Sequence, residues 1–390
     1  MKFFFEILKE MSSDTIAVRR EFHQNPELGF HEVKTAEIIC RQLDKMGVPY
    51  EKNVAQTGVV ATLQGNEGGK TLLIRADMDA LELVEENTFE HISKTEGKMH
   101  ACGHDAHMAI LLATCEVLNK LRNEFRGIVK FVFQPAEELV GGALPMIEEG
   151  VMQNPEVDAC IALHVWPWLE AGIVQIMDGM VYASPDVFDI TIHGVGGHGA
   201  LPELCINPVT TGAEIISELE SEKGNIAPTG EPFALSVCAF NAGAGPNVIP
   251  QSALIRGTVR TVNTETRKKV PAIMENLIKC VCDKYGAKYD FNYIFRYPPV
   301  INDPEISRLV HEAARQIVGE NAIWGGKPSL GGEDFAYFTE LVPSAIFRLG
   351  CGNKEKGITS SLHSSTFDLD EDCMDIGAAV FAAFAFNYLQ

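Results

Sequence analysis

Short apolar strands alternate with apolar helices along much of the chain, and this alternation constrains the fold more than any other feature. Strand patterns rich in β-branched residues lie at 58–63, 71–77, 127–135, 158–165 and 344–350, and helical patterns lie at 107–121, 306–318 and 375–389. Alternation of this kind is typical of α/β proteins, in which helices cover both faces of a sheet. We therefore expect an α/β fold.

The pattern changes between about residue 187 and residue 295. Strands are predicted at 187–193, 233–243, 253–262 and 288–295, with helices at 207–223 and up to 282. This β-α-β-β-α-β order is typical of a ferredoxin-like α+β module with one solvated sheet face. We expect a small domain, residues 184–298, inserted into a larger domain made of residues 1–183 and 299–390. A chain of 390 residues is long enough for two such cores.

The amino-terminal region predicts three helices. The opening stretch "MKFFFEILKEM" reads as a short amphipathic helix, since Glu6 and Lys9 break the apolar run before it reaches the length of a signal peptide or a membrane span. A second helix, capped by Ser or Asp of "SSD", is expected to end at the Asn25-Pro26 breaker, and a third at Gly47.

Composition narrows the range of partners. The chain has 32 Lys and Arg against 53 Asp and Glu, a net charge of −21 without any basic run. Nucleic-acid binding needs a concentrated positive surface, so we expect no such partner and no membrane partner. The ten cysteines lie mostly in apolar contexts, which predicts free thiols in a reducing, cytoplasmic compartment.

Residues that bind metals gather after the predicted core strands. In "KMHACGHDAH", residues 98–107, Cys102 and His104 follow the strand that carries Asp77 and Asp79. The carboxyl ends of strands in an open α/β sheet are where ligands collect. Three more residues, Glu137, Glu138 and His164, follow or end neighbouring strands, and His363 lies in the small polar loop "SSLHSS".

Thiolate, imidazole and carboxylate together suit zinc or a related ion. The set Cys102, His104, Glu138, His164 and His363 exceeds what one tetrahedral ion needs, so two ions that share a ligand are expected. In two-metal hydrolases the ions activate water and polarise the scissile carbonyl. Glu137 is the candidate that moves the proton, and Asp79 is the candidate that orients a ligating imidazole.

Each residue taken singly has a simpler interpretation. A lone histidine such as His164 or His363 is more often a core or surface residue than a ligand, and the Glu137-Glu138 pair could be a solvated helix start. Cys102 could be a nucleophile with His104 as its base, although residues two apart on one loop seldom have that geometry and no oxyanion motif accompanies them. Taken together, these residues all follow successive core strands, and such a grouping of ligand types is hard to obtain by accident.

At these residues the chain resembles the M20 metallopeptidase family, most closely its amidohydrolase branch, which includes hippurate hydrolases, N-acyl-amino-acid deacetylases and auxin-conjugate hydrolases. The matching stretches are "RREFHQNPELGFHE", "RADMDAL", "MHACGHDAHMA", "FQPAEE", "LHVWP", "GGHGALP", "NVIP", "GTVRT" and "GGEDFAYF". They cover nearly the whole chain in order.

The resemblance implies a zinc-peptidase-like catalytic domain with a lid and dimerisation domain. It implies that Cys102, His104, Glu138, His164 and His363 hold two ions (Zn, Mn, Co or Ni) and that Glu137 is the acid/base. It further implies that His198 stabilises the oxyanion, often in the partner's site, and that the protein is a homodimer. The substrate-binding residues that it implies are Asn247, Gly332 and Glu333.

Three positions of the lid stretch depart from the family pattern. Val195 replaces a lysine, Glu203 a histidine and Asn207 an aspartate. Because the catalytic set is intact, we expect a metal-dependent amidohydrolase that cleaves N-acyl or N-aroyl amino acids. A dipeptidase or carboxypeptidase using the same centre is the alternative. A non-catalytic binding protein would be expected to lack a ligand or the base, and none is missing.

Overall fold

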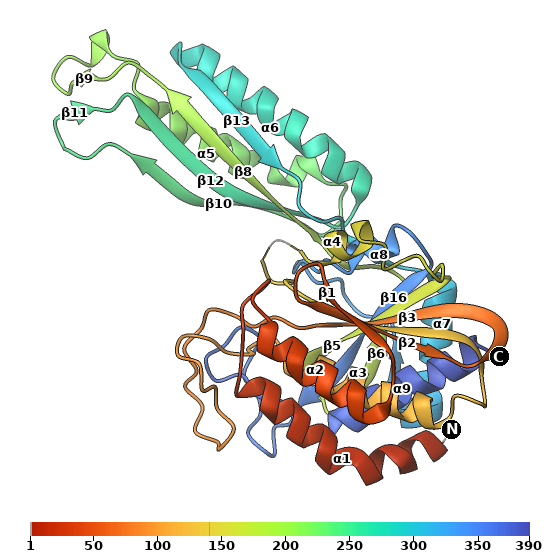
Figure 1. Cartoon of the computed structure of the whole chain (residues 1–390). Helices are drawn as coiled ribbons and strands as arrows, with labels where there is room; N and C mark the ends of the chain where they lie inside the picture. The colour runs from red at the N-terminus through yellow and green to blue at the C-terminus, as the bar shows by residue number, and fades with distance from the viewer. Residues whose placement is uncertain (1, 140) are drawn as a thin grey trace. The chain divides into compact units, whose positions relative to one another are not determined.

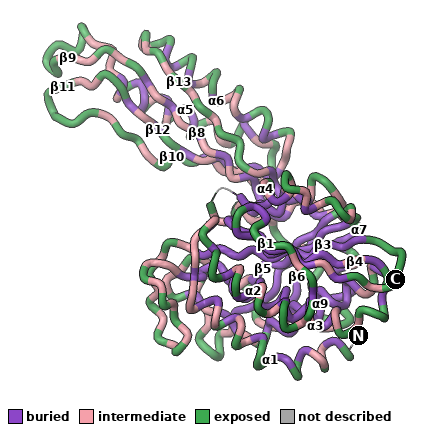
Figure 2. Tube along the Cα trace, in the orientation of Figure 1, coloured by how far each residue is buried: buried purple, intermediate pink, exposed green. Residues whose placement is uncertain are grey.

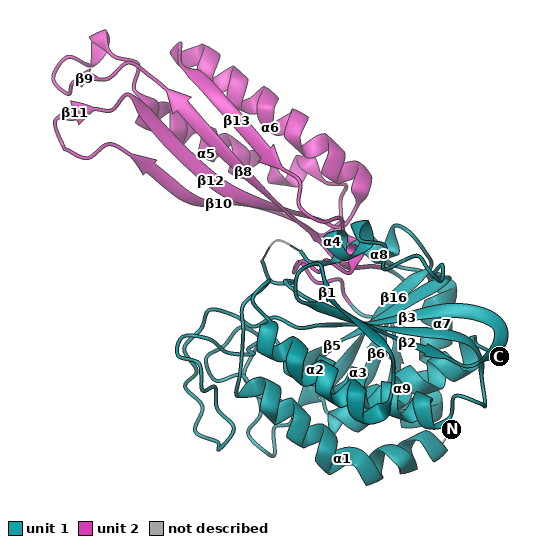
Figure 3. Ribbon diagram, in the orientation of Figure 1, with its two compact units in different colours: residues 1–179, 301–326, 337–390 teal, residues 180–300, 327–336 magenta. Residues whose placement is uncertain are grey.

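Apolar β-branched runs form the strands of an eight-stranded mixed sheet in unit 1, the larger of the two units into which this computed structural model divides (Figures 1 and 3). Unit 1 comprises residues 1–179, 301–326 and 337–390, and unit 2 comprises residues 180–300 and 327–336. The structure describes residues 2–139 and 141–390, so Met1 of the predicted first helix lies outside the described residues. None of the helices in these ranges has the length and apolar character that a membrane crossing requires.

The sheet of unit 1 has the strand order β1-β2-β4-β3-β5-β16-β6-β15. Its strands are β1 (Tyr50–Val54), β2 (Gly58–Gln64), β3 (Asn66–Asp77), β4 (Arg126–Gln134), β5 (Ala159–Glu170), β6 (Val174–Ile176), β15 (Ala322–Trp324) and β16 (Ser344–Gly352). The central strands β4, β3, β5 and β16 run parallel to one another. Every residue of β16 is buried, as Figure 2 shows for much of the sheet centre, which explains why such strands read as continuous apolar runs.

The helices of unit 1 pack against this sheet and against one another. They are α1 (Lys2–His23), α2 (Val33–Met46), α3 (His104–Lys120), α4 (Ala143–Glu148), α7 (Pro304–Val318) and α9 (Cys373–Tyr388), with the 3-10 turn η2 (Gly319–Asn321). Helix α3 lies between α1 and α9, and all three contribute to one apolar core with the strands. This arrangement confirms the predicted α/β fold class.

Helix α1 corrects the prediction for the amino terminus. The short first helix and the capped second helix are one continuous helix, Lys2–His23, that passes through "SSD" without a cap. The reason is an unbroken buried stripe, with Phe4, Leu8, Met11 and Phe22 at helical spacing. Ser and Asp act as N-caps only where a helix begins, and no glycine or proline within α1 interrupts the helix before "SSD". The third predicted helix, α2, does end at Gly47, whose φ of 66° is the left-handed conformation that favours glycine.

Unit 2 has the ferredoxin-like topology predicted from its pattern. Its main elements are β8 (Ser184–His193), α5 (Pro208–Ile226), β10 (Phe233–Ala242), β12 (Ser252–Thr261), α6 (Thr264–Tyr285) and β13 (Lys288–Ile294). The four strands form an antiparallel sheet in the order β10-β12-β8-β13, and α5 and α6 bury a separate core against it. Short pieces complete it: β9 (Gly197–His198), η1 (Pro202–Leu204) and β11 (Val248–Ile249).

Three short elements lie at the borders of the units. They are β7 (Gly179–Tyr182), β14 (Val300–Asn302) and α8 (Ala336–Thr339). The segment 327–336, which follows the return of the chain to unit 1, belongs to unit 2. Unit 2 is therefore built from two stretches of sequence.

Candidate metal centre

Four segments of unit 1 bring the five predicted metal ligands together. Cys102 lies on the loop before α3, and His104 is the first residue of that helix. Glu138 follows β4, His164 lies on β5, and His363 lies on the loop between β16 and α9. Strands β4, β3 and β5 are parallel neighbours, so the residues at and beyond their carboxyl ends meet at one edge of the sheet.

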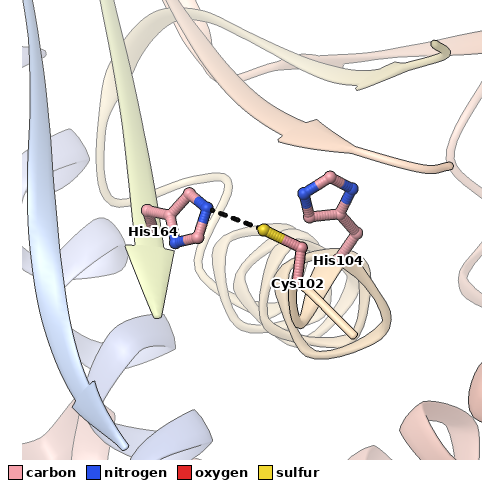
Figure 4. Close-up of side chains that lie close together, drawn as sticks. All are labelled: Cys102, His104 and His164. Carbon is pink, nitrogen blue, oxygen red and sulfur yellow. Dashed lines mark hydrogen bonds between the residues drawn. The ribbon is translucent and has the colours of Figure 1, made fainter. Parts of the chain in front are cut away.

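The ligand atoms of these residues converge. Cys102 Sγ lies 3.5 Å from His164 Nε2, and the side chain of His104 lies beside them (Figure 4). Glu138 Oε1 lies 3.1 Å from His363 Nε2 and 3.9 Å from His104 Nε2. Two groups of potential ligands, Cys102 with His104 and His164, and Cys102 with Glu138 and His363, each fall within 4.8 Å and share the thiol.

The chemistry of this set fits two divalent ions. His104 Nε2 is buried and makes no hydrogen bond within the described part of the chain. A buried polar atom without a partner costs free energy, and a cation bound between His104 and Glu138 would remove that cost. Sulfur, nitrogen and oxygen donors around one shared thiol suit zinc and its neighbours in the first transition row.

Backbone conformations that are rare for other residues hold the ligand loops in place. Gly103, between two ligands, has φ 83°, and a Cβ there would lie 2.4 Å from Val165 Cγ2. Ala136, next to Glu137, has φ 55°, and His363 has φ 61°. Such left-handed conformations in non-glycine residues are found where the surrounding structure imposes them, and they cluster at functional sites.

Asp79 lies against the predicted ligand His104. Its carbonyl oxygen is 2.9 Å and its Oδ1 is 3.3 Å from His104 Nδ1, while its Oδ2 accepts a hydrogen bond of 3.0 Å from the backbone N–H of Glu138. Nδ1 therefore carries a proton, and Nε2 is the nitrogen that faces the other ligand atoms. Asp79 thus contacts two of the predicted ligands without belonging to the ligand group.

A second buried network, missed by the sequence analysis, lies behind His164. Asp77 Oδ1 is 2.6 Å from His107 Nδ1, and His107 Nε2 accepts a hydrogen bond of 2.9 Å from the backbone N–H of Val165. Arg75 donates to the other oxygen of Asp77 at 2.7 Å. The i,i+3 spacing of His104 and His107 on one helix was the available signal, because it places both rings on the same face.

Burial and neighbouring charges together determine the protonation of several of these groups in the metal-free chain. Burial raises the pKa of the Cys102 thiol well above its ordinary value, and Glu138 and Glu137 raise it further. Burial, together with the nearby His107, lowers the pKa of His164 to about 3, so its imidazole is neutral and offers a lone pair. Burial by itself would raise the pKa of Asp77, but His104, His107 and Arg75 hold it well below its ordinary value.

Glu137 is buried beside the ligands, with an exposed fraction of 7 %. One of its oxygens belongs to a group with His104 and Glu138 that falls within 4.8 Å. Residues of the segment before α2 contact the loop that carries Glu137. Glu32 Oε1 accepts a hydrogen bond of 2.9 Å from Ala136 N–H, and a Cβ added at Gly29 would lie 2.8 Å from Ala136 Cβ. The stretch "PELGFHE" therefore supports the Glu137 loop.

The other predicted site residues belong to unit 2. His198 and Asn247 lie together and exposed at the β9–β11 pair, where Gly199 N–H donates to Asn247 O at 2.9 Å. Glu333 is buried, and its Oε1 accepts a hydrogen bond of 2.9 Å from Phe335 N–H in the same loop as Gly332. The roles of these four residues at the metal centre stay predictions.

Comparison with known proteins gives consistent matches over most of the chain. Residues 73–387 match the family model described as peptidase family M20/M25/M40. An N-acyl-L-amino acid amidohydrolase of Geobacillus stearothermophilus is 43 % identical over 300 residues, 77 % of this chain and 80 % of that protein. Thermostable carboxypeptidase 2 of Saccharolobus solfataricus is 36 % identical over 385 residues, 98 % of this chain and 97 % of that protein.

One solved structure extends the match to three dimensions. The YXEP protein of Bacillus subtilis, described as a dinuclear metal binding peptidase from the M20 family, superposes with a TM-score of 0.86 at 34 % identity. The match covers 98 % of this chain and 99 % of that one.

Proposed function

The chain belongs to peptidase family M20/M25/M40 and is a hydrolase of amide or peptide bonds, and from this premise we propose that it cleaves N-acyl or N-aroyl amino acids to a carboxylic acid and a free amino acid. The amidohydrolase relative, at 43 % identity, supports this choice of substrate class. Two divalent ions per subunit are the cofactors of the proposal.

The observation that carries the proposal is that five residues form two groups of ligand atoms sharing the Cys102 thiol, with a Glu137 oxygen close to His104 and Glu138. The five residues are Cys102, His104, Glu138, His164 and His363. A buried carboxylate next to a two-metal ligand set can promote hydrolysis of an unactivated amide, because the ions activate water and the carboxylate moves its proton. A protein that only bound metal would not need Glu137 at this position.

The proposed reaction needs an activated water, a polarised carbonyl and a group that moves a proton. The chemistry that two bound divalent ions supply is polarisation of the scissile carbonyl and a lower pKa of the attacking water. Glu137 takes the proton from that water and delivers it to the leaving nitrogen. Asp79 keeps the Nδ1 proton of His104 in place, so Nε2 remains the ligating atom.

His198 is proposed as the oxyanion donor. Its Nδ1 accepts a hydrogen bond of 3.0 Å from Ala200 N–H, so the neutral ring carries its proton on Nε2. An exposed Nε2–H is a donor of the kind that a developing oxyanion requires. Asn247, Gly332 and Glu333 are proposed to hold the substrate, residues 184–298 to serve as lid and dimerisation domain, and residues 1–183 and 299–390 as catalytic domain.

The test is a substrate panel with defined metal content. Protein stripped of metal and reloaded with Zn²⁺, Mn²⁺, Co²⁺ or Ni²⁺ is assayed for released amine from N-acetyl, N-benzoyl and dipeptide substrates. We expect metal-dependent release from the N-acyl amino acids. Metal-loaded protein that releases amine from none of them would contradict the proposal.

A carboxypeptidase or dipeptidase is the second candidate function. It is favoured by the 36 % identity to a carboxypeptidase over 98 % of the chain. The same panel separates the two, since this candidate predicts faster release from peptides than from N-acyl amino acids.

We further propose a cytoplasmic homodimer. All ten cysteines are free thiols, which suits a reducing compartment. The dimer rests on the family resemblance, with His198 acting in the partner's site. Sedimentation analysis of the metal-loaded protein is expected to give twice the chain mass of 42.7 kDa, and a monomer alone at micromolar concentration would overturn the dimer.

A further inference from the structure

Strand β5 carries a row of aromatic rings that begins at the metal centre. His164, Trp166 and Trp168 are alternate residues of one strand, so their side chains project from the same face. The ring centroids of His164 and Trp166 are 6.1 Å apart, and those of Trp166 and Trp168 are 4.8 Å apart. We call these three residues the aromatic row.

The aromatic row runs from the buried centre to the surface. His164 has an exposed fraction of 7 %, Trp166 is half-buried, and Trp168 is 61 % exposed. The largely exposed indole of Trp168 presents apolar surface, and contact with another apolar group would remove that surface from water. Its position, two rings from a predicted metal ligand, indicates substrate as the covering group.

The neighbouring strand β16 fixes Trp166, the middle ring of the aromatic row. The Arg348 guanidinium lies over the ring of Trp166, 4.2 Å from its centroid. The register of β16 against β5 shifts between Gly350 and Gly352, and the two backbones lie very close together there. A Cβ at Gly350 would lie 2.2 Å from Glu170 O, and one at Gly352 would lie 2.3 Å from Pro167 O. Trp166 is thus held rigidly, and a rigid ring stacks on a ligand at little cost in entropy.

The sheet order shows which part of the substrate reaches the aromatic row. Glu137 follows β4, the aromatic row lies on β5, and β3 lies between these two strands. The leaving nitrogen must lie near Glu137 to receive its proton, so the acyl group extends from the carbonyl carbon toward the other side, where the aromatic row begins. The axes of β4 and β5 are two strand spacings, about 10 Å, apart, which leaves room for a substrate to extend across β3 from one to the other.

We propose that Trp166 and Trp168 form the acyl subsite of this enzyme and select planar aromatic acyl groups over small alkyl ones. The proposal rests on the proposed amidohydrolase function, because only that function assigns the acyl side of the scissile amide, and not the amino-acid side, to the aromatic row. The substrate class is N-aroyl or N-arylacyl amino acids, whose ring stacks on the exposed indole of Trp168 while Trp166 forms the wall next to the metal centre.

Trp168→Ala is the variant that tests the proposal kinetically, with N-benzoyl-alanine, N-acetyl-alanine and N-acetyl-phenylalanine as substrates. We expect KM for N-benzoyl-alanine to rise about five- to tenfold, with kcat and both N-acetyl substrates little changed, because stacking on one aromatic ring is worth about that factor. Trp168→Phe should restore most of the loss. Trp324→Ala is the matched control, since Trp324 is 45 % exposed in the same unit but lies on the edge strand β15.

The binding of the same compounds to the metal-loaded Glu137→Gln variant tests the aromatic row without turnover, because this variant keeps all five predicted metal ligands and lacks the proposed proton acceptor. Calorimetric Kd values are expected to be several-fold lower for N-benzoyl-alanine than for N-acetyl-alanine, and adding Trp168→Ala should abolish the difference. If the metal-loaded enzyme hydrolyses none of these compounds, the amidohydrolase function fails while the binding ratio still decides the aromatic row. Equal Kd values in the Glu137→Gln variant, no effect of Trp168→Ala on the ratio, or an effect confined to N-acetyl-phenylalanine would each overturn the proposal.

Discussion

Two adjacent carboxylates, Glu137 and Glu138, have different surroundings in the structure. The backbone N–H of Glu138 is bound by Asp79 and its side chain faces His363 and His104, whereas Glu137 follows Ala136, whose left-handed conformation turns the chain just before it. The sequence offered both residues as candidates and predicted that one binds metal and the other moves a proton. What it could not supply was the support from Glu32 and Gly29, which lies a hundred residues earlier in the chain.

Glu137→Gln is the direct test of that division. We expect metal content to stay at the level of the parent protein and kcat to fall about a hundred- to ten-thousand-fold, because the amide keeps the shape of the side chain and cannot accept the water proton. Metal analysis and steady-state kinetics measure the two effects. Glu116→Gln, at a half-buried position of α3 where the carboxylate pairs with Lys120, is the control. Near-normal kcat in Glu137→Gln would remove the acid/base role.

Cys102→Ser tests the shared ligand. The raised pKa of the thiol keeps Cys102 protonated in the metal-free chain at neutral pH, so metal binding must displace that proton and becomes tighter as the pH rises. The variant should bind less metal after dialysis and release about one proton fewer on loading. Cys280→Ser, which changes an exposed thiol of unit 2, should keep both values, and full occupancy in Cys102→Ser would exclude ligation.

At the scale of elements, periodicity predicted most strands and helices because the residues it reads are those that the core buries. Strands β3, β4, β5 and β16 and the ferredoxin-like order of unit 2 follow from apolar runs and alternation. Helix α1 differs, because a continuous buried stripe overrode the capping signal of "SSD". The spacing of His104 and His107 indicates only that both rings share one helix face. The contacts of His107 with Asp77 and Val165 could not be predicted, since they depend on which strands become neighbours.

A pair of glycines tests how close packing holds the sheet of unit 2. A Cβ at Gly257, in β12, would lie 2.3 Å from the ring of Phe188 and 2.4 Å from Ser236 O, whereas one at Gly224, in α5, would meet nothing within 4 Å. Gly257→Ala should therefore lower the free energy of unfolding of unit 2 by about 1–3 kcal/mol, the usual cost of overpacking. Gly224→Ala should be neutral or stabilising by up to about 1 kcal/mol, because alanine is the better helix former. Urea unfolding of both variants measures the difference, and equal effects would show that β12 and β10 can separate to admit a methyl group.

At the scale of the whole molecule, the predicted metal ligands lie in one unit only, so metal binding is expected to stabilise that unit. All five predicted ligands lie in unit 1, and unit 2 has an apolar core of its own. Domains with separate cores often unfold in separate transitions, and a ligand stabilises only the folded state that binds it. We therefore expect calorimetry to resolve two transitions, one of which moves to lower temperature when a chelator removes the metal.

The Gly257→Ala variant shows which transition belongs to which unit. It should lower the unfolding temperature of unit 2 and leave the metal-dependent transition of unit 1 unchanged. At free metal about a thousandfold above Kd, the stabilisation of unit 1 is about 4 kcal/mol, which is large enough to resolve in a heating scan. A chelator that shifted both transitions equally would mean that the units unfold together. In that case the metal centre would stabilise the whole molecule. The Gly257→Ala substitution would then be expected to weaken metal retention in unit 1 as well as the sheet of unit 2 in which Gly257 lies.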